Sequence, residues 1–495
     1  MNRLSANYER LAQAYQSLGN QKYLLGDYHE ADLYLNKAIG VIEQNGLQDD
    51  PIYASCLNSV GALNEAIASY DEAKKSYAQA YEISKGEGVS KRLKVASASN
   101  LANIINFFDP LNDSISMLYK EALLWQEQLT GRMHPDFANL LNKRGLSLQR
   151  LSQYDSAAVD YQEAAGILEY TVGLSHPEYL VSISNLGLLY ADMGRDEEAL
   201  SQMREAKNLY EAYYADSNPG YILTINNLAN QYTKVGEYEN AEKLFLQLTD
   251  IGLQEINDSF TYLSESEKKD FVAEKKKFLE NLKKYIVTRY IKEEAEVNPE
   301  ILLSWYNLEL NIKGILLNST KKVRDQIFSS GNEDLISLFS DWTVARKQVA
   351  DLQSLKSENI ANAGKKLDSL NSQISALEKE ISRSSAAFGT SFSKGSISYA
   401  NIRDALGPGE ASIEVVRIAF EKDIIYVALY ANNTLQYPKL IVIGKDDPLE
   451  KKAYQTYKNT IAYKVSNSTP FNAYWKPVHD QLIADNITKV YFTPD

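Results

Sequence analysis

The residues that could build a nucleophilic or metal site are few, because the chain has one cysteine and four histidines. A cysteine nucleophile needs a base within hydrogen-bonding distance. Cys56 lies in a predicted helix, where a small core residue is the better interpretation. His29, His134 and His176 lie at turns, and no cysteine is near His479 in the sequence. The sequence therefore predicts no catalytic residues, no metal site and no cofactor.

Asparagine side chains are the other group with useful chemistry, because an amide both donates and accepts hydrogen bonds and can hold an extended peptide backbone. Nearby lysine and arginine residues would favour acidic peptides. The candidate peptide-binding residues are Asn100, Asn103, Lys143, Arg150, Asn185, Asn227, Asn230 and Lys234. The alternative is that asparagine is simply tolerated on a polar helix face.

A repeat in the first half of the chain supplies the elements that would hold these residues in a row. Small residues, followed by a turn and then by alanine, recur at 42-residue intervals. In the sixth copy Ile225 and Leu228 mark the apolar face of one helix. Gly236 then permits a tight turn, and Ala241 lies in a second helix. We expect about six such helix pairs over residues 5–255, with their apolar faces buried on one another.

The third copy departs from this pattern. Residues 107–112 replace the usual turn, and about one extra residue is expected before Tyr119 and Ala122. A local kink and a degenerate loop are both compatible with this difference.

The pattern resembles the tetratricopeptide repeat, especially the 42-residue variety of kinesin light chains. That variety often carries Gly-x-x-His-Pro between units, which residues 131–135 and 173–177 match and Asn218-Pro219 echoes weakly. The resemblance implies a superhelix whose first helices line a concave groove and contact peptides through the asparagine positions. The expected partner is therefore a protein or an extended peptide.

Composition narrows the classes of partner. The net charge of −13 argues against a nucleic-acid ligand, which needs a basic surface. No run of 18 apolar residues is present, so we expect no membrane-spanning segment. The N-terminus lacks an apolar signal core, which makes the cytoplasm the default location. At 495 residues, the chain is expected to form two or three domains.

A helical connector is predicted over residues 256–390. Apolar residues at 335–352 and at 367–381 recur at alternating steps of three and four, which is the spacing of a heptad seam. Residues 357–364 between them suit a turn. An antiparallel coiled-coil hairpin is the economical interpretation, and self-association through these seams is the alternative.

The periodicity changes over residues 395–495. Runs of β-branched and aromatic residues predict three strands within 411–443 and a fourth at 488–493. Helical patterns at 448–465 and 470–485 separate the third strand from the fourth. This order indicates part of an α/β domain.

The same order, behind a repeat array and a helical connector, resembles the start of a CHAT domain, a caspase- and separase-related bacterial module. The likeness rests on residues 262–267, 311–324, 402–411, Glu414 and 493–495. It implies a caspase-like fold and a parent cysteine endopeptidase that the repeats would control. The family's catalytic histidine and cysteine motifs would follow residue 495, so this chain is expected to be inactive.

Together these observations predict a mainly α protein, with a tetratricopeptide-repeat superhelix, a helical hairpin and a partial α/β segment. The expected function is a protein- or peptide-binding scaffold that regulates an attached CHAT-type protease domain. The alternative is a non-catalytic scaffold or adaptor with a small complete C-terminal α/β domain.

Overall fold

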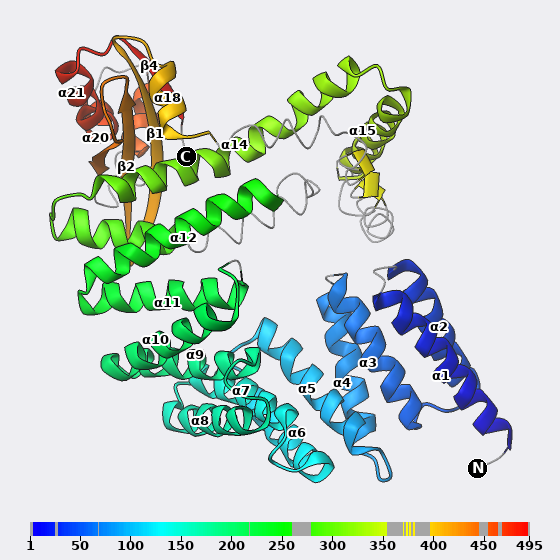
Figure 1. The fold of residues 1–495 in the computed structure, drawn as a ribbon. Coiled ribbons are helices and arrows are strands. Elements are labelled where there is room, and N and C mark those ends of the chain that lie inside the picture. Colours follow the sequence, from blue (N-terminus) through cyan, green and yellow to red (C-terminus); the bar gives the residue numbers. More distant parts are fainter. Residues whose placement is uncertain are drawn as a thin grey trace. The chain divides into compact units, whose positions relative to one another are not determined.

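A computed structural model describes most of the chain and divides it into two compact units, Met1–Asn227 and Leu228–Asp495. The first unit is helical throughout, and the second combines helices with one sheet (Figure 1). The residues described are 3–24, 28–67, 69–216, 218–259, 279–353, 397–444, 454–463 and 468–493, with single positions or pairs between 370 and 381.

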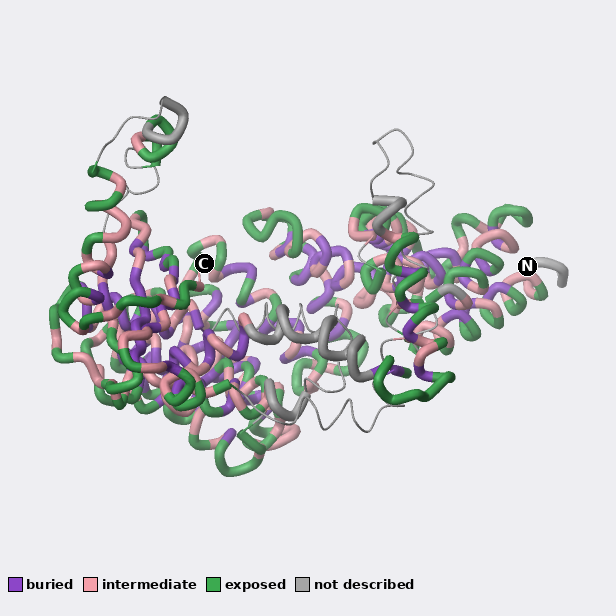
Figure 2. The backbone as a smooth tube through the Cα atoms, turned by 90° about the horizontal axis from the view of Figure 1, so that it is seen from above, coloured by how far each residue is buried: buried purple, intermediate pink, exposed green. Residues whose placement is uncertain are grey.

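The first unit consists of helix pairs, as the repeat predicts. In each pair the odd-numbered helix is the first helix of a repeat and packs against the even-numbered helix that follows. The helices are α1 (Arg3–Leu24), α2 (Tyr28–Gln44), α3 (Pro51–Ala66), α4 (Tyr70–Ser84), α5 (Lys91–Phe108), α6 (Ser114–Thr130), α7 (Pro135–Arg150), α8 (Tyr154–Thr171), α9 (Pro177–Asp192) and α10 (Asp196–Tyr213). Helix α11 (Pro219–Val235) begins in this unit, which ends at Asn227. Buried and exposed positions alternate along the helices (Figure 2).

Close packing inside a pair depends on glycine in the first helix. A Cβ atom on Gly61 would lie 2.5 Å from the ring of Tyr77, and one on Gly145 would lie 2.8 Å from the ring of Tyr161. Both distances are far below van der Waals contact. The rings therefore pack directly on the backbone of α3 and of α7.

The Gly-x-x-His-Pro motifs form the turns that start a new repeat. Gly131 and Gly173 adopt φ values of +83° and +87°, a left-handed conformation that glycine accepts without strain. The Nδ1 atom of His134 accepts a hydrogen bond from the backbone N–H of residue 136 at 3.2 Å, and His176 caps α9 in the same way at 3.3 Å. Proline then occupies the first position of the helix. These histidines are helix caps, as their place in the turns suggested.

The third repeat keeps the 42-residue register, so the predicted extra residue is wrong. Tyr119 and Ala122 are buried 42 residues after Tyr77 and Ala80. The departure is confined to residues 109–113, a longer turn that shortens the start of α6.

The division between the two units falls inside the sixth repeat, at Leu228. The end of the repeat array near residue 255 stays a prediction. Helix α12 (Tyr238–Ser259) contributes Glu242, whose carboxylate accepts hydrogen bonds from the hydroxyl groups of Tyr285, at 2.8 Å, and Tyr290, and from the amide of Asn298. Tyr285 lies in the helical segment 279–286, and Tyr290 lies in the π-helix η1 (Val287–Lys292). These bonds join α12 to the connector.

The connector continues with α14 (Pro299–Ser329) and α15 (Glu333–Gln353). Leu335 and Trp342 of the first predicted seam lie in one hydrophobic cluster with Ile381 of the second seam, and Ile374 packs against it. This contact fits a helical hairpin. The predicted turn at 357–364 lies outside the described residues, and the coiled coil stays a prediction.

A mixed four-stranded sheet follows the short helix α18 (Tyr399–Ala405). The strands β1 (Glu410–Phe420), β2 (Asp423–Asn432), β3 (Lys439–Gly444) and β4 (Lys489–Thr493) lie in the order β3-β2-β1-β4. Strand β1 pairs antiparallel with β2 and parallel with β4. Helices α19 (Tyr454–Tyr463), α20 (Thr469–Tyr474) and α21 (Lys476–Ala484) separate β3 from β4, where two helices were expected. The caspase-like fold stays a prediction.

Helix α14 is fastened to the sheet region by buried polar contacts. The Asn311 side chain donates to the carbonyl of Ile397 at 3.0 Å and accepts from its N–H at 3.1 Å. Lys313 forms an ion pair with Glu414 of β1, whose side chain is 4 % exposed. These contacts fix α14 against the strand.

Candidate protein-binding site

The first helices of repeats four to six each present one stripe of accessible side chains. Residues spaced i, i+4, i+7 and i+11 lie on one face of a helix. We name the residues of the first unit that follow this spacing the first-helix stripe, and each of them is exposed or half-buried. They are Asn139, Lys143, Leu146 and Arg150 on α7; Val181, Asn185, Leu188 and Asp192 on α9; and Leu223 and Asn227 on α11.

One row crosses this stripe from helix to helix. Lys143, Asn185 and Asn227 follow one another at steps of 42 residues, so each occupies the same place in its repeat. Within the described residues, none of these three side chains makes a hydrogen bond or an ion pair. The row therefore presents one ammonium group and two amides that are available to a ligand.

A second set of polar residues, also at 42-residue steps, joins the repeats together instead. We call Gln16, Asn58, Asn100, Asn142 and Ser184 the polar column. Gln16 donates to Ser55 at 2.9 Å, Asn58 to Ser97 at 2.8 Å, Asn100 to Asn58 at 3.3 Å and Asn142 to Ser182 at 2.8 Å, and the hydroxyl groups of Ser184 and Thr224 lie 3.4 Å apart. Each bond joins the first helices of neighbouring repeats.

The structure separates the predicted peptide-binding residues into different roles. Asn100 belongs to the polar column. Asn103 occupies the place that glycine takes in repeats two and four, and its side-chain oxygen accepts the Tyr119 hydroxyl at 2.6 Å inside its own repeat. Both asparagines therefore serve the packing of the repeats.

The basic candidates also differ from one another. Lys143 is exposed and belongs to the row, whereas Arg150 donates to the side-chain oxygen of Asn106 and so connects α7 with α5. Asn230 and Lys234 lie on the same face of α11 as Asn227 but belong to the second unit. Lys234 already takes part in an interaction within the chain.

Sequence reasoning missed the apolar members of the stripe. Val181 and Leu223 are 40 % and 59 % exposed, and they share one place in consecutive repeats. Writing the chain in rows of 42 residues would have shown both as apolar residues next to the row. They add hydrophobic contact area for a ligand.

The polar column is interrupted between α5 and α7. These two helices make hardly any close backbone contact, whereas α3 with α5 and α7 with α9 do. Asn100 on α5 donates to Asn58 on α3 and not to a residue of α7. On α7, the buried side-chain oxygens of Asn139 and Asn142 have no hydrogen-bond partner among the described residues. The joint between repeats three and four is therefore built differently from its neighbours.

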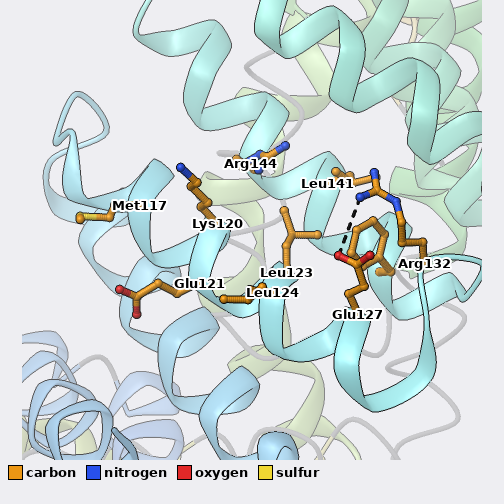
Figure 3. Close-up of a pocket in the computed structure, with 10 residues that line it drawn as sticks. Met117, Lys120, Glu121, Leu123, Leu124, Glu127, Arg132, Leu141 and Arg144 are labelled. Atoms are coloured by element: carbon orange, nitrogen blue, oxygen red, sulfur yellow. Dashed lines mark ion pairs between the residues drawn. The ribbon is translucent and has the colours of Figure 1, made fainter.

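A pocket of about 410 Å³ lies beside this joint, between α6 and α7 (Figure 3). Its apolar lining is Met117, Leu123, Leu124, Phe137 and Leu141, and its charged lining is Lys120, Glu121, Glu127, Arg132 and Arg144. Most of these charges are already paired. Glu121 accepts the Tyr81 hydroxyl at 2.6 Å, and Arg132 pairs with Glu163.

Arg144 is held by a buried carboxylate. Its Nε donates to Asp160 Oδ2 at 2.7 Å, and the side chain of Asp160 is 2 % exposed. Burial raises the pKa of Asp160, although hydrogen bonding and the charge of Arg144 act in the opposite direction. Lys120, in contrast, is exposed and forms no ion pair within the described part of the chain.

Groups for other chemistry are missing from the described residues. No cluster of histidine, cysteine or acidic side chains there has the arrangement of a metal site. Burial in α3 raises the pKa of the Cys56 thiol to about 12, which keeps it protonated at neutral pH. No helix among those residues has both the length and the apolar character needed to cross a membrane.

Comparison with known proteins supports the repeat. Residues 12–45 and 178–254 match the sequence profile of the tetratricopeptide repeat. No curated protein matches the chain significantly.

Several solved structures are similar to part of the chain. BtubC (BKLC) from P. vanneervenii is 16 % identical with a TM-score of 0.37, and the match covers 49 % of this chain and 90 % of that one. A putative kinesin light chain of Podosopora anserina is 18 % identical with a TM-score of 0.37, covering 41 % and 95 %. NprR, solved with its cognate peptide NprX, is 16 % identical with a TM-score of 0.38, covering 64 % and 79 %. The profile matches show that the chain carries tetratricopeptide repeats.

Proposed function

We propose that the chain is a protein-binding scaffold that holds an extended peptide segment along the first-helix stripe. The observation that carries this proposal is the row of Lys143, Asn185 and Asn227, which occupies one place in each of repeats four to six and makes no hydrogen bond or ion pair within the described residues. Residues that serve only the fold would be expected to bond within it, as those of the polar column do. An amide can pair with both the N–H and the C=O of a peptide backbone.

The stripe also favours a particular polarity in the ligand. Lys143 and Arg150 place two cations on α7, whereas Asp192 places an anion on α9. The peptide segment that lies over α7 would therefore carry acidic residues. Val181 and Leu223 would contact its apolar side chains.

A peptide-array screen with the full chain tests this function. We expect binding to a subset of acidic, partly apolar peptides, and a loss of at least tenfold in affinity in the triple variant Lys143→Ala/Asn185→Ala/Asn227→Ala, at about 1 kcal/mol or less for each contact. The matched control is Lys74→Ala/Gln128→Ala/Asn208→Ala, which removes one lysine and two side-chain amides, each exposed or half-buried, from second helices. Equal binding by the triple variant and the wild type would refute the assignment.

We further propose, following the resemblance to CHAT domains, that the scaffold regulates an attached cysteine protease domain. Asn311 and Glu414, two positions in that resemblance, are among the residues that connect α14 with the sheet region. Such a joint would let a movement of the connector reach the strands. Sequencing the gene beyond codon 495 tests this proposal, which requires a His-Gly and an Ala-Cys motif within about one domain length. A stop codon there would favour the adaptor alternative.

The chain itself is proposed to lack protease activity. Cys56 is a buried, protonated thiol, and the ring of His479 packs at 5.2 Å from that of Phe471. Neither group has the surroundings of a reactive nucleophile or base. In an assay of the purified chain with fluorogenic peptides, the wild type and the Cys56→Ser variant should show the same background rate of cleavage.

A further inference from the structure

The polar row of the first-helix stripe has apolar residues on both sides, and these also recur at 42-residue steps. Towards the start of the helices, Val181 of α9 and Leu223 of α11 share one place in their repeats and are 40 % and 59 % exposed. Towards the end, Leu146 of α7, which is exposed, and Leu188 of α9, which is half-buried, share another place. A ligand that contacts both members of a pair must therefore repeat with the spacing of the helices.

This spacing distinguishes between backbone conformations of the ligand. The first helices touch one another, because the amide of Asn142 donates to Ser182 at 2.8 Å and the hydroxyl groups of Ser184 and Thr224 lie 3.4 Å apart. The axes of helices in contact lie about 8–10 Å apart. A polyproline II helix has three residues per turn and rises about 3.1 Å per residue, so that one turn covers about 9.3 Å. Such a ligand presents the same face to each successive repeat.

Two other conformations match the stripe less well. In a β-strand the same face returns every two residues, after about 6.6 Å, and a step of three residues presents the opposite face. An α-helix uses its backbone N–H and C=O groups internally, which would leave the amides of Asn185 and Asn227 without backbone groups to bond. A polyproline II helix makes no internal hydrogen bonds, so these groups stay available.

The charge of the stripe is complementary to one kind of residue in the ligand. The polar row and the apolar pairs on its two sides contain a single charged residue, Lys143. Its side chain is exposed and forms no ion pair within the described part of the chain. Arg150 and Asp192, which follow at the next place of the stripe, carry opposite charges. An acidic residue over α7 would therefore be the favoured charged contact.

We propose that the ligand of the first-helix stripe is a proline-rich segment in the polyproline II conformation, with apolar residues at every third position and an acidic residue over α7. This inference rests on the function proposed above and names the class of peptide. Proline fixes φ near −65°, which lowers the conformational entropy lost on binding. Each proline keeps its carbonyl group, to which the amides of Asn185 and Asn227 can donate.

Two nine-residue peptides of identical composition test the spacing. The period-three probe is Glu-Leu-Pro-Gln-Leu-Pro-Gln-Leu-Pro, and the period-two probe is Glu-Leu-Gln-Leu-Gln-Leu-Pro-Pro-Pro. Each carries a dye on an added Gly-Gly linker and is also made in reversed sequence, so that both chain directions are sampled. In fluorescence anisotropy with the full chain, the period-three probe in its better direction should bind at least fivefold more tightly than the period-two probe. Replacing its glutamate by glutamine should weaken binding about threefold.

Variants of the stripe separate the contributions to binding. Val181→Ser/Leu223→Ser introduces the residue that repeats two and three carry at this place, and should weaken binding of the period-three probe at least fivefold. The matched control is Met117→Ser/Val159→Ser, which removes two exposed apolar residues that share one place on second helices and should bind like the wild type. Lys143→Gln should remove the preference for glutamate over glutamine in the probe.

The outcomes separate this inference from the function on which it rests. Equal binding of the two probes, or tighter binding of the period-two probe, overturns the polyproline II ligand. If that binding is lost in Lys143→Ala/Asn185→Ala/Asn227→Ala, the stripe remains the peptide site and the proposed function stands. The inference is also overturned if the period-three probe does not bind, or if Val181→Ser/Leu223→Ser binds it like the wild type.

Discussion

The two units of the molecule join neighbouring elements by different means. In the first unit, similar contacts recur at multiples of 42 residues: a glycine packs on a tyrosine ring in repeats two and four, and neutral polar side chains join neighbouring first helices. In the second unit, α14 is joined to β1 by contacts that occur once each: the ion pair of Lys313 with the buried Glu414 and the hydrogen bond from Tyr306 to Ser412 at 3.5 Å. Where similar contacts recur in every repeat, each contributes a small part of the total stability. Where a buried ion pair occurs once, loss of either residue leaves the other charge buried without its partner.

Breaking the unique joint should have the largest effect. We expect Lys313→Met to lower the free energy of unfolding of the second unit by about 3 kcal/mol at pH 7, because it leaves the carboxylate of Glu414 buried without its partner. Urea denaturation followed by tryptophan fluorescence measures the loss. The double variant Lys313→Met/Glu414→Met should lie within about 1 kcal/mol of the wild type, and a double variant as unstable as the single one would contradict the argument.

The same joint should respond to pH. Burial raises the pKa of Glu414 above its ordinary value of 4.5, against the opposing effect of Lys313. A raised carboxyl pKa contributes stability below the unfolded pKa, and this contribution is lost as the pH rises through the folded pKa. The cost of Lys313→Met should therefore be smaller at pH 5 than at pH 7.

Breaking one repeated joint should cost less. Gly145→Ala places a methyl group 2.8 Å from the Tyr161 ring, and we expect a loss of about 2 kcal/mol. Hydrogen exchange of the amides in α7 and α8 reports the effect locally. In Gly166→Ala on α8, where the new methyl group meets open space, we expect a gain of up to about 1 kcal/mol instead.

The helix caps test a still smaller contribution. His176→Ala removes the acceptor for the backbone N–H of Glu178, and a loss of about 1 kcal/mol is expected. His176→Asp keeps an acceptor at the same place and should retain most of the stability in thermal unfolding. If both variants were equally destabilised, the role of the histidine side chain would lie in something other than the cap.

The smallest change in stability is expected for the row residues of the first-helix stripe, and it distinguishes them from the residues of the polar column. Lys143→Ala/Asn185→Ala/Asn227→Ala should change the unfolding free energy by no more than about 0.5 kcal/mol, because none of these side chains is bonded within the described residues. Asn58→Ala, which loses its bonds with Ser97 and Asn100, should cost about 1 kcal/mol. Similar stability losses in these two variants would remove the basis for assigning them different roles.

The repeats, their turns and the strands could be predicted because each has a local pattern. The spacing of Gly145 and Ala157 predicts a helix pair, and the spacing of His134 and His176 predicts the repeat of such pairs every 42 residues. Whether an asparagine bonds to a neighbouring first helix depends on a shift of one position in the repeat. Asn100 lies in the polar column, whereas Asn185 lies one place further along its repeat and belongs to the row.

Other features could not be predicted, because they depend on contacts between residues far apart in the sequence. Lys313 and Glu414 are 101 residues apart, and nothing near either residue identifies its partner. The pocket lies between α6 and α7, at the joint between repeats three and four. It becomes visible only when α6 and α7 are seen together (Figure 3).

The helix caps, the glycines and the polar column recur at 42-residue spacing, and this spacing determines which insertions or deletions the repeats can accept. Removing residues 136–177 would bring the cap His134 and Pro135 directly before Glu178, which already follows His176 and Pro177. Every joint downstream would then find an equivalent partner, whereas a deletion of 41 residues would turn each helix face away from its neighbour by about 100°. A whole repeat is thus the unit whose gain or loss preserves the packing, and the proposed ligand-binding row could be lengthened or shortened without a change of fold.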